Sequence, residues 1–355
     1  MIGIHDSPGS YSDRWLDWCL QKQVPFKRLN CLATDIVPQC AGLSAVLWHW
    51  TLVRLEEALV ARQIITALEQ AGIVVFPSTA TCWHYDDKVG QKYLFESLGV
   101  PLVPTWVFTD PAEARAWIAG ATWPKVFKLR CGAGSENVQL VRSRPQAEAL
   151  CRRAFRAGFP GSAGYLYDAP KRLRKIKGWH DFWEKLQRAP RSLVETLELR
   201  RYAPRQRGYV LFQEFMPGNN FDTRVNIIGP RAFGLIRRNR PNDFRASGSG
   251  NCLYDPDRVD RRFVSLAFRV AEQLRTQSLS CDFLFDANRD PRICEISYCS
   301  VASPVHDCQG YWDPEFVWRA GHFWPQDLIL QDLLAAVASR AAPTTAALQT
   351  ANRTL

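Results

Sequence analysis

The stretch SCDFLFDANRDPRICEIS, residues 280–297, decides the fold. Two apolar runs flank the polar residues DANRD, which predicts two antiparallel strands joined by a tight turn. With the turn centred on Asn288 and Arg289, Asp282 lies opposite Glu295, and Ser297 follows two residues later on the same face. The sequence therefore predicts two carboxylates that face each other on adjacent strands, with Cβ atoms about 5 Å apart.

Opposed carboxylates are unfavourable at this distance unless they are protonated or bridged by a cation. A hard divalent cation with oxygen ligands is the simplest bridge, so Mg²⁺ is the ion that Asp282 and Glu295 predict. The alternative is a solvated strand face on which the two carboxylates spread apart into water.

The surrounding sequence predicts an α/β (α+β) protein. In the first eighty residues, short apolar runs alternate with amphipathic stretches. One stretch predicts a helix that ends at Gly72, with its apolar residues on one face: Ala58, Ala61, Ile65 and Leu68. Asp110, followed by Pro111, predicts the start of another helix. The predicted divisions are a small βα domain (1–80), a small lobe (81–150), a basic insertion (151–208), a large lobe with the hairpin (209–340) and a tail (341–355). Further strands are expected at 102–108, 125–130, 138–142, 209–215, 223–228 and 232–237, and further helices at 86–98 and 259–275.

Composition and charge exclude several classes of protein. The 355 residues are 46% hydrophobic and 23% charged, which excludes wholesale disorder and a collagen-like chain. There is no apolar run long enough to cross a membrane and no signal-like start, and the 11 cysteines form no CxxC pair, so a cytoplasmic protein is expected. The net charge of +10 lies within residues 151–207, which hold 15 Lys and Arg against 5 Asp and Glu. The excess charge therefore belongs to one segment, which also contains an amphipathic helix marked by Trp179, Phe182, Trp183 and Leu186.

Two lysines are candidates for contact with phosphate groups. Lys128 lies in the apolar strand VFKLR just before the turn CGAGSEN, in which Gly132, Gly134 and Ser135 leave backbone N–H groups accessible. Lys88 follows two aspartates at the start of a helix. The alternative for each lysine alone is an ordinary surface residue.

In this order along the chain, residues 87–297 resemble the ATP-grasp superfamily, above all its RimK-type and D-alanine-ligase-type carboxylate–amine ligases. The resemblance implies two α+β lobes that clasp ATP, preceded by a small βα domain, with one or two Mg²⁺ ions. In that family a DK pair, a strand lysine, a glycine-rich loop and a QE hinge bind the nucleotide. The residues that match this nucleotide set are Asp87, Lys88, Lys128, Gly132, Gly134, Ser135, Gln213, Glu214, Phe215, Met216 and, near the ribose, Asp222, which Arg224 follows.

The resemblance also implies catalytic residues and metal ligands. Arg237, Arg245 and Ser247 match stretches that approach the phosphates and the reacting carboxylate, and Arg237, Arg245 and Lys128 are the expected catalytic residues. Asp282 and Glu295 match the metal ligands. Ser297 is the third expected metal ligand: it stands where the family usually has Asn, and a hydroxyl can still coordinate magnesium although it is a poorer ligand than an amide oxygen.

The activity that this likeness implies is an ATP-dependent ligase that makes an amide through an acyl phosphate. The basic run KRLRKIK at 171–177 favours a polyanionic carboxylate substrate, such as a uronic-acid-bearing surface glycan or an acidic peptide, joined to a small-molecule amine. A solvated insertion is the alternative for this run. Two other functions stay open: an ATP-grasp phosphotransferase acting on a hydroxyl, and a nucleotide- or nucleic-acid-binding protein without turnover.

Three further predictions concern aromatic, thiol and imidazole side chains. Trp312, Trp318 and Trp324 are expected to close a core rather than to bind sugars. Cys294 alternates with its neighbour Glu295, so its side chain is expected to point away from the carboxylates and into the core. Its spacing to Cys299, His306 and Cys308 lacks the paired knuckle of a zinc site, and His306 is expected to be a structural or loop histidine rather than a general base.

Overall fold

The structure is a computed structural model, and it describes residues 1–52, 54–132, 137–160 and 205–341. Within these residues the strands form three sheets, one in the N-terminal part and two in the remainder. The predicted α/β architecture is confirmed. The basic run at 171–177, the amphipathic helix expected around 179–186 and the tail from 342 onward lie outside the described residues.

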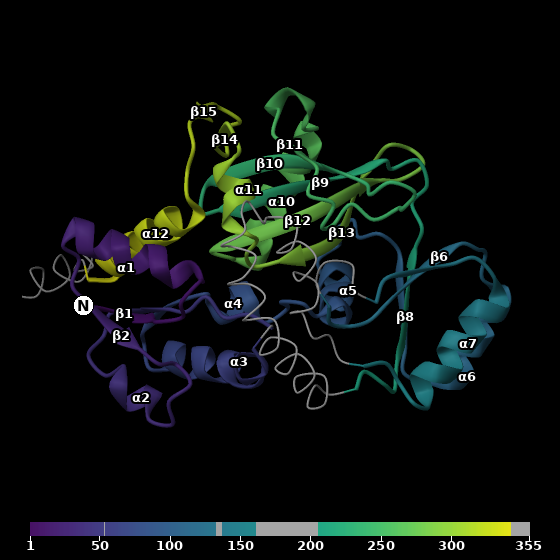
Figure 1. Ribbon diagram of the computed structural model, residues 1–355, viewed down its shortest axis with the longest axis horizontal. Coiled ribbons are helices and arrows are strands. Elements are labelled where there is room, and N and C mark those ends of the chain that lie inside the picture. The colour runs from purple at the N-terminus through teal and green to yellow at the C-terminus, as the bar shows by residue number, and fades with distance from the viewer. Residues whose placement is uncertain (53, 133–136, 161–204, 342–355) are drawn as a thin grey trace, which may run out of the picture.

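The N-terminal unit is a parallel sheet covered by helices (Figure 1), with the strand order β2-β1-β3-β4. Strands β1, β3 and β4 are buried along their whole length and are largely apolar, as in Ala45–Leu47, whereas the edge strand β2 is partly exposed. Gly72 has a φ of +82°, which ends the long helix as predicted. The elements are β1 (Ile2–His5), α1 (Tyr11–Lys22), β2 (Phe26–Leu29), α2 (Ile36–Gln39), β3 (Ala45–Leu47), α3 (Leu55–Gln70), β4 (Val74–Phe76) and the short α4 (Thr79–Cys82).

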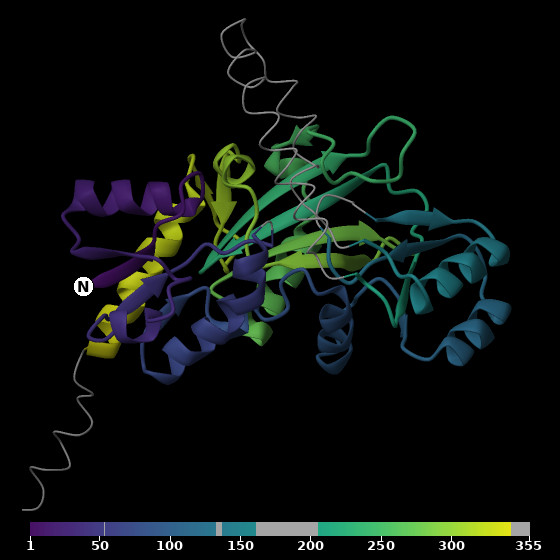
Figure 2. The same ribbon diagram turned by 60° about the horizontal axis from the view of Figure 1, so that its bottom comes forward.

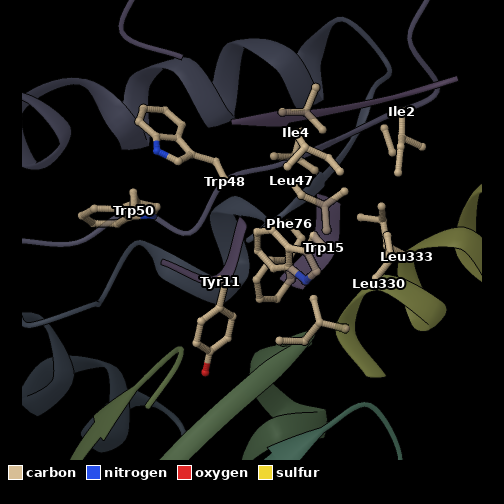
Figure 3. Packing of buried hydrophobic residues seen from close by; sticks show 14 of the residues in the cluster. Ile2, Ile4, Tyr11, Trp15, Leu47, Trp48, Trp50, Phe76, Leu330 and Leu333 are labelled. Carbon is tan, nitrogen blue, oxygen red and sulfur yellow. The ribbon is translucent and has the colours of Figure 1, made fainter. Parts of the chain in front are cut away.

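The last described helix, α12 (Pro325–Ala341), packs on α1 and β4 of this N-terminal unit and also contacts β9 and α11 of the large lobe, so its residues share one core with both. Figure 3 shows Leu330 and Leu333 of α12 beside Trp15 and Phe76. The Trp15 indole Nε1 donates a hydrogen bond to the carbonyl of Gln326 at 2.9 Å. The helix is needed there because a parallel sheet has to be covered on both faces.

A second four-stranded sheet is antiparallel and belongs to the small lobe, with the order β5-β8-β6-β7. Helices α6 and α7 pack against each other and against this sheet. The Asp110 carboxylate accepts a hydrogen bond from the Ala112 N–H at 2.9 Å, which confirms the predicted helix start. The elements are β5 (Thr105–Phe108), α6 (Pro111–Gly120), β6 (Lys125–Lys128), β7 (Gln139–Val141), α7 (Arg144–Phe155) and β8 (Val210–Glu214).

The largest sheet has the order β13-β12-β9-β10-β14-β15, and β11 pairs with β10. Helix α10 is strongly amphipathic and buries its apolar face against this sheet. The buried residues are spaced three and four apart, as in Phe263, Ala267 and Val270. Figures 1 and 2 both show α5 (Lys88–Ser97) between the N-terminal unit and the small lobe, beside the hairpin of this sheet. The other elements are β9 (Phe221–Ile228), β10 (Arg231–Arg238), β11 (Cys252–Leu253), a 3-10 turn (Pro256–Arg258), α10 (Arg261–Leu274), β12 (Ser278–Phe285), β13 (Pro291–Ser297), α11 (Ala302–His306), β14 (Gly310–Trp312) and β15 (Trp318–Ala320).

The hairpin of β12 and β13 has the predicted pairing at its functional end. Asp282 lies opposite Glu295, and Ser280 lies opposite Ser297. A β-bulge follows directly, because Phe283 pairs with Ile293 and leaves Cys294 as an extra residue on β13. The simple alternation of side chains therefore breaks at Cys294.

The three C-terminal tryptophans do not form one stripe. Trp312 is buried in the core of the large lobe, as predicted, and its ring centroid lies 4.7 Å from that of Trp318. Trp324 lies apart from this pair and stacks on His306 at 4.0 Å. Within the described ranges, none of the helices combines the length and the apolar composition needed to cross a membrane.

Candidate active site

A row of alternating charges crosses three strands of the large sheet. Arg237 on β10 donates to both carboxylate oxygens of Asp222 on β9, at 2.7 and 2.6 Å, and its Nη2 lies 2.8 Å from an oxygen of Asp282 on β12. Arg224 on β9 binds the same Asp282 through two hydrogen bonds of 2.6 and 2.8 Å. These side chains share one face because Asp222 and Arg224 are two residues apart and each lies opposite its partner on the next strand.

The arginines fix the ionisation of Asp282. Burial acts to raise the pKa of this carboxyl, but the attraction of Arg224 and Arg237 outweighs burial and holds the pKa well below its usual range. Burial likewise acts to lower the pKa of Arg237, and its two aspartates raise it further than burial lowers it. Asp282 and Arg237 are therefore both charged at neutral pH, whereas burial raises the pKa of Asp222.

The second carboxylate of the hairpin has a different partner. Glu295 forms an ion pair with Lys88 of α5, with Oε1 and Nζ 2.9 Å apart. The same Nζ donates to the carbonyl of Gly132 at 3.0 Å and lies 3.3 Å from Oδ1 of Asp86. Lys88 is therefore buried between the start of α5, the hairpin and the beginning of the predicted glycine-bearing turn. Asp282 and Glu295 are opposite one another as expected, but each is neutralised by cationic side chains.

Asp87, the acidic member of the predicted DK pair, begins α5. Its carboxylate accepts from the Gly90 N–H at 2.9 Å, which caps the helix, and it forms a two-pronged ion pair with Arg130 of the small lobe. It thereby holds the start of α5 against the end of the strand that carries Lys128.

Lys128 extends from the small sheet to the bulge of the hairpin, where its Nζ lies 3.4 Å from Sγ of Cys294. The Cys294 thiol also lies 3.5 Å from Oε1 of Gln213 in the predicted hinge. The prediction that Cys294 points into the core was wrong, because the bulge turns its side chain toward the same site as Glu295. Burial raises the pKa of this thiol, and Lys128 counteracts only part of the rise.

The hinge residues after β8 have distinct partners. The Glu214 carboxylate pairs with Lys125 at 3.0 Å, and the carbonyl of Met216 accepts a hydrogen bond from Asn219 at 3.2 Å. Phe215 packs edge-on against Phe244, with ring centroids 5.9 Å apart. It lies in a groove of about 670 Å³ between β7 and the loop after β10, whose lining includes Val138, Gln139, Asp243, Phe244 and Arg245.

The remaining predicted residues are engaged elsewhere. Arg245 pairs with Asp243 at 2.7 Å in the groove, and the carbonyl of Ser247 accepts from Arg240 at 2.5 Å. The Ser297 hydroxyl donates to the carbonyl of Cys299 at 2.7 Å instead of pointing freely toward the carboxylates. Two other predicted residues, Gly134 and Ser135, lie outside the described residues.

Comparison with solved structures identifies the fold. D-cycloserine synthetase DcsG superimposes with a TM-score of 0.56 at 14% identity, over 94% of this chain and 99% of that one. The ATP-grasp ligase PsnB, solved with a minimal precursor, Mg and ADP, gives 0.54 at 13% identity, over 95% and 98%. D-alanine–D-alanine ligase from Bacillus anthracis gives 0.53 at 12% identity, over 96% and 99%. The chain has an ATP-grasp fold.

Sequence comparison adds one local match. A phosphoribosylamine–glycine ligase from Nostoc sp. is 31% identical over 109 residues, which are 30% of this chain. The match spans only 25% of the length of that curated relative. No protein-family model matches the chain. The resemblance expected from the motifs is thus confirmed at the level of the ATP-grasp fold.

The oxygen ligands on the hairpin of β12 and β13 suit a magnesium ion that arrives as a complex with a nucleotide. Among the residues that the structure describes, no group of three or more His, Cys, Asp or Glu side chains is arranged to hold a metal ion. Asp282 and Glu295 supply two carboxylates, and magnesium is commonly held by one or two carboxylates together with substrate phosphates and water. The residues present therefore fit Mg²⁺ bound as a complex with a polyphosphate.

Two residues of this candidate site, Lys125 and Asp86, were missed in the sequence, and a third, Arg224, was mentioned without being assigned a role. Arg224 was noted only as following Asp222, although its spacing of two residues already places it on the same strand face. Lys125 pairs with the hinge, but nothing in its strand pattern separates it from a surface lysine. Asp86 contacts both Lys88 and the Gly132 N–H, and it depends on a left-handed backbone that the sequence does not indicate.

Proposed function

We propose that this protein is an ATP-dependent carboxylate–amine ligase that forms an amide through an acyl phosphate and releases ADP. One observation carries the proposal: cationic side chains from three separate parts of the fold converge on one acidic hairpin. Lys128 comes from the small sheet, Lys88 from α5 and Arg237 from the large sheet, and they contact Cys294, Glu295 and Asp282 respectively.

Such a site has the chemistry needed to hold a triphosphate. In this proposal Lys128 and Arg237 bind phosphate oxygens, and the hinge from Gln213 to Met216 faces the base. Asp282 and Glu295 hold Mg²⁺, which when bound neutralises the charge of the polyphosphate. Transfer of a phosphoryl group depends on positioning and on charge stabilisation more than on covalent help from the protein, which agrees with a site rich in charges.

The proposed reaction has two steps. A carboxylate oxygen of the first substrate attacks the terminal phosphorus of ATP, and the bond to the bridging oxygen of ADP breaks. The nitrogen of the amine then attacks the acyl carbon, phosphate leaves, and the amine loses a proton to give the amide. Fixed cations such as Lys128 and Arg237 stabilise the charge on the oxygens in the first step, and removal of one such group should lower turnover by about 10²- to 10³-fold.

For the carboxylate substrate we propose a polyanion, either an acidic peptide or a uronic-acid-bearing glycan. The support is the excess of 15 Lys and Arg over 5 Asp and Glu in residues 151–207. PsnB, which has the same fold, was solved with a precursor peptide, and this favours testing acidic peptides first.

The test is a screen for ADP release with carboxylates and amines supplied in pairs, followed by mass measurement of the product. A ligase gives a product lighter than its two substrates together by one water, and it releases phosphate in step with ADP. A phosphotransferase gives a product that keeps the phosphate. If no pair yields ADP and the protein binds RNA or DNA in a salt-sensitive manner, the ligase proposal is wrong. Lys128→Met should lower the rate of ADP release by about 10²- to 10³-fold, whereas Lys92→Met, which removes a surface pair with Glu96 on α5, should leave the rate unchanged.

A further inference from the structure

Asp86 adopts an unusual backbone conformation next to the proposed nucleotide site. Its φ is +49°, a left-handed value that most residue types avoid and that aspartate adopts only occasionally, and its side chain is buried. Backbone strain of this kind persists only where surrounding contacts hold it in place. The contacts of the Asp86 carboxylate therefore indicate why the conformation is kept.

The carboxylate joins two parts of the site. Its two oxygens accept hydrogen bonds from the Gly132 N–H, at 2.9 and 2.8 Å, which fixes the backbone where the glycine-bearing turn begins. Its Oδ1 also lies 3.3 Å from the Lys88 ammonium. Hydrogen bonds to an ionised acceptor are stronger than neutral ones, so Asp86 is a firm anchor for both groups.

The Lys88 ammonium has no spare donor in this arrangement. A lysine carries three N–H donors, and three acceptors surround this one: Asp86, the Gly132 carbonyl at 3.0 Å and Glu295 at 2.9 Å. Two of these acceptors belong to the anchor formed by Asp86 and Gly132. The third, Glu295, lies on the hairpin and is a proposed ligand of Mg²⁺.

We propose that Asp86 is a positioning residue, which holds Lys88 and the start of the glycine-bearing turn so that the donor now given to Glu295 can pass to a nucleotide phosphate. This inference rests on the proposed function. When Glu295 engages a cation, its hold on Lys88 weakens, and the two bonds to Asp86 and Gly132 keep the ammonium in place. Without Asp86, Lys88 keeps only the Gly132 carbonyl as an anchor, and the turn loses its fixed N–H group.

The test compares two variants that lack the same carboxylate but differ in backbone strain. Asp86→Ala and Asp86→Gly should both weaken binding of ADP with Mg²⁺ by about tenfold, measured by calorimetry, because both lose a charged hydrogen-bond acceptor. Asp86→Gly should melt at a higher temperature than Asp86→Ala, because glycine tolerates a positive φ. Asp86→Asn keeps an acceptor for the Gly132 N–H and should lose less affinity than either variant.

The matched control is Asp327→Asn. This substitution removes charge from a part-buried ion pair with Arg14, between α12 and α1, and should lower the melting temperature without changing nucleotide affinity. A purely structural role for Asp86 predicts instead that affinity follows melting temperature across all four variants, and that result would overturn the inference. Wild-type affinity in Asp86→Ala and Asp86→Gly would overturn the positioning role alone. A wild-type protein that fails to bind ADP with Mg²⁺ would overturn the proposed function as well.

Discussion

Arg224 and Asp282 are held together across neighbouring strands by two hydrogen bonds of 2.6 and 2.8 Å. Asp282 lies at the centre of the charged row, since Arg237 contacts it from the other side. One carboxylate therefore separates two guanidinium groups that would otherwise repel each other in a partly buried setting. Its charge is needed both for the stability of the large lobe and for the proposed site.

Asp282→Asn should lower the free energy of unfolding by about 3 kcal/mol at pH 7, because it leaves two arginines without their shared counter-charge. The pKa of Asp282 is depressed in the folded protein, so its contribution to stability is present above the unfolded value of about 3.9 and is lost as the pH falls through the lower folded value. Denaturant titrations should show the gap between variant and wild type at pH 7 and a smaller gap below about pH 3.9. A gap that is independent of pH would contradict this account.

Glu295→Gln should raise the magnesium concentration needed for half-maximal ADP formation and lower turnover by about 10²- to 10³-fold. The amide can still accept a hydrogen bond from Lys88, so the fold should be preserved, but it binds a hard cation more weakly than a carboxylate does. Glu96→Gln, which affects only a surface pair with Lys92, is the control. An unchanged magnesium requirement in Glu295→Gln would remove Glu295 from the metal site.

Nucleotide should protect Cys294 from a thiol reagent. The thiol lies 3.4 Å from Lys128 and 3.5 Å from Gln213, so a bound nucleotide would cover it. Labelling should be slow in the free protein, because burial raises the thiol pKa and little thiolate is present. Peptide mass spectrometry with and without ADP and Mg²⁺ measures the effect. Cys151, on the small-lobe helix α7, serves as the internal control and should label at the same rate in both conditions.

His84 should make the protein less stable in acid. It is fully buried, neither of its ring nitrogens has a hydrogen-bond partner within the described part of the chain, and burial lowers its pKa to about 4. The unfolded chain takes up this proton near pH 6.5, so stability should fall by up to about 3 kcal/mol as the pH drops from about 6.5 to 4. His84→Leu should flatten that part of the stability curve, whereas replacing the exposed His322 should leave the slope unchanged. Equal slopes in wild type and His84→Leu would exclude His84 as the cause.

Leu330→Ala should destabilise the protein by about 2 to 5 kcal/mol, because Leu330 of α12 is fully buried against the N-terminal sheet. Affinity for ADP with Mg²⁺ should not change in the fraction that stays folded. Leu59→Ala, on the exposed side of α3, should change the melting temperature little. A small effect at Leu330 would mean that α12 contributes little to this core.

The sequence was sufficient for most of the fold because its elements carry strong local signals. The pairing of Asp282 with Glu295 follows from the two-residue alternation of side chains along a strand and from the short polar turn between the strands. The structure has that pairing. The position of α12 could not be predicted in the same way. Its apolar residues indicate a helix with a buried side, but no local pattern tells which sheet they cover, since packing between distant segments decides that.

The sequence predicted the charged residues of the candidate site but not the residues that lie beside them. Lys88, Lys128 and Arg237 were identified as cations of one site, and their contacts with the hairpin bring them together. Cys294 was assigned to the wrong face because one extra residue in a strand reverses the alternation, and a bulge leaves no clear mark in the sequence. Asp86 depends on a backbone conformation that its residue type does not favour.

The packing of α12 on the first sheet has a consequence for biosynthesis. A ribosome makes the N-terminal unit first, but Leu330 and Leu333, which complete its core, are translated about 250 residues later. At a translation rate of roughly 5 to 20 residues per second, the apolar face around Trp15 and Phe76 stays uncovered for on the order of ten seconds or more. This apolar face of the nascent chain therefore stays uncovered until the last helix has been made.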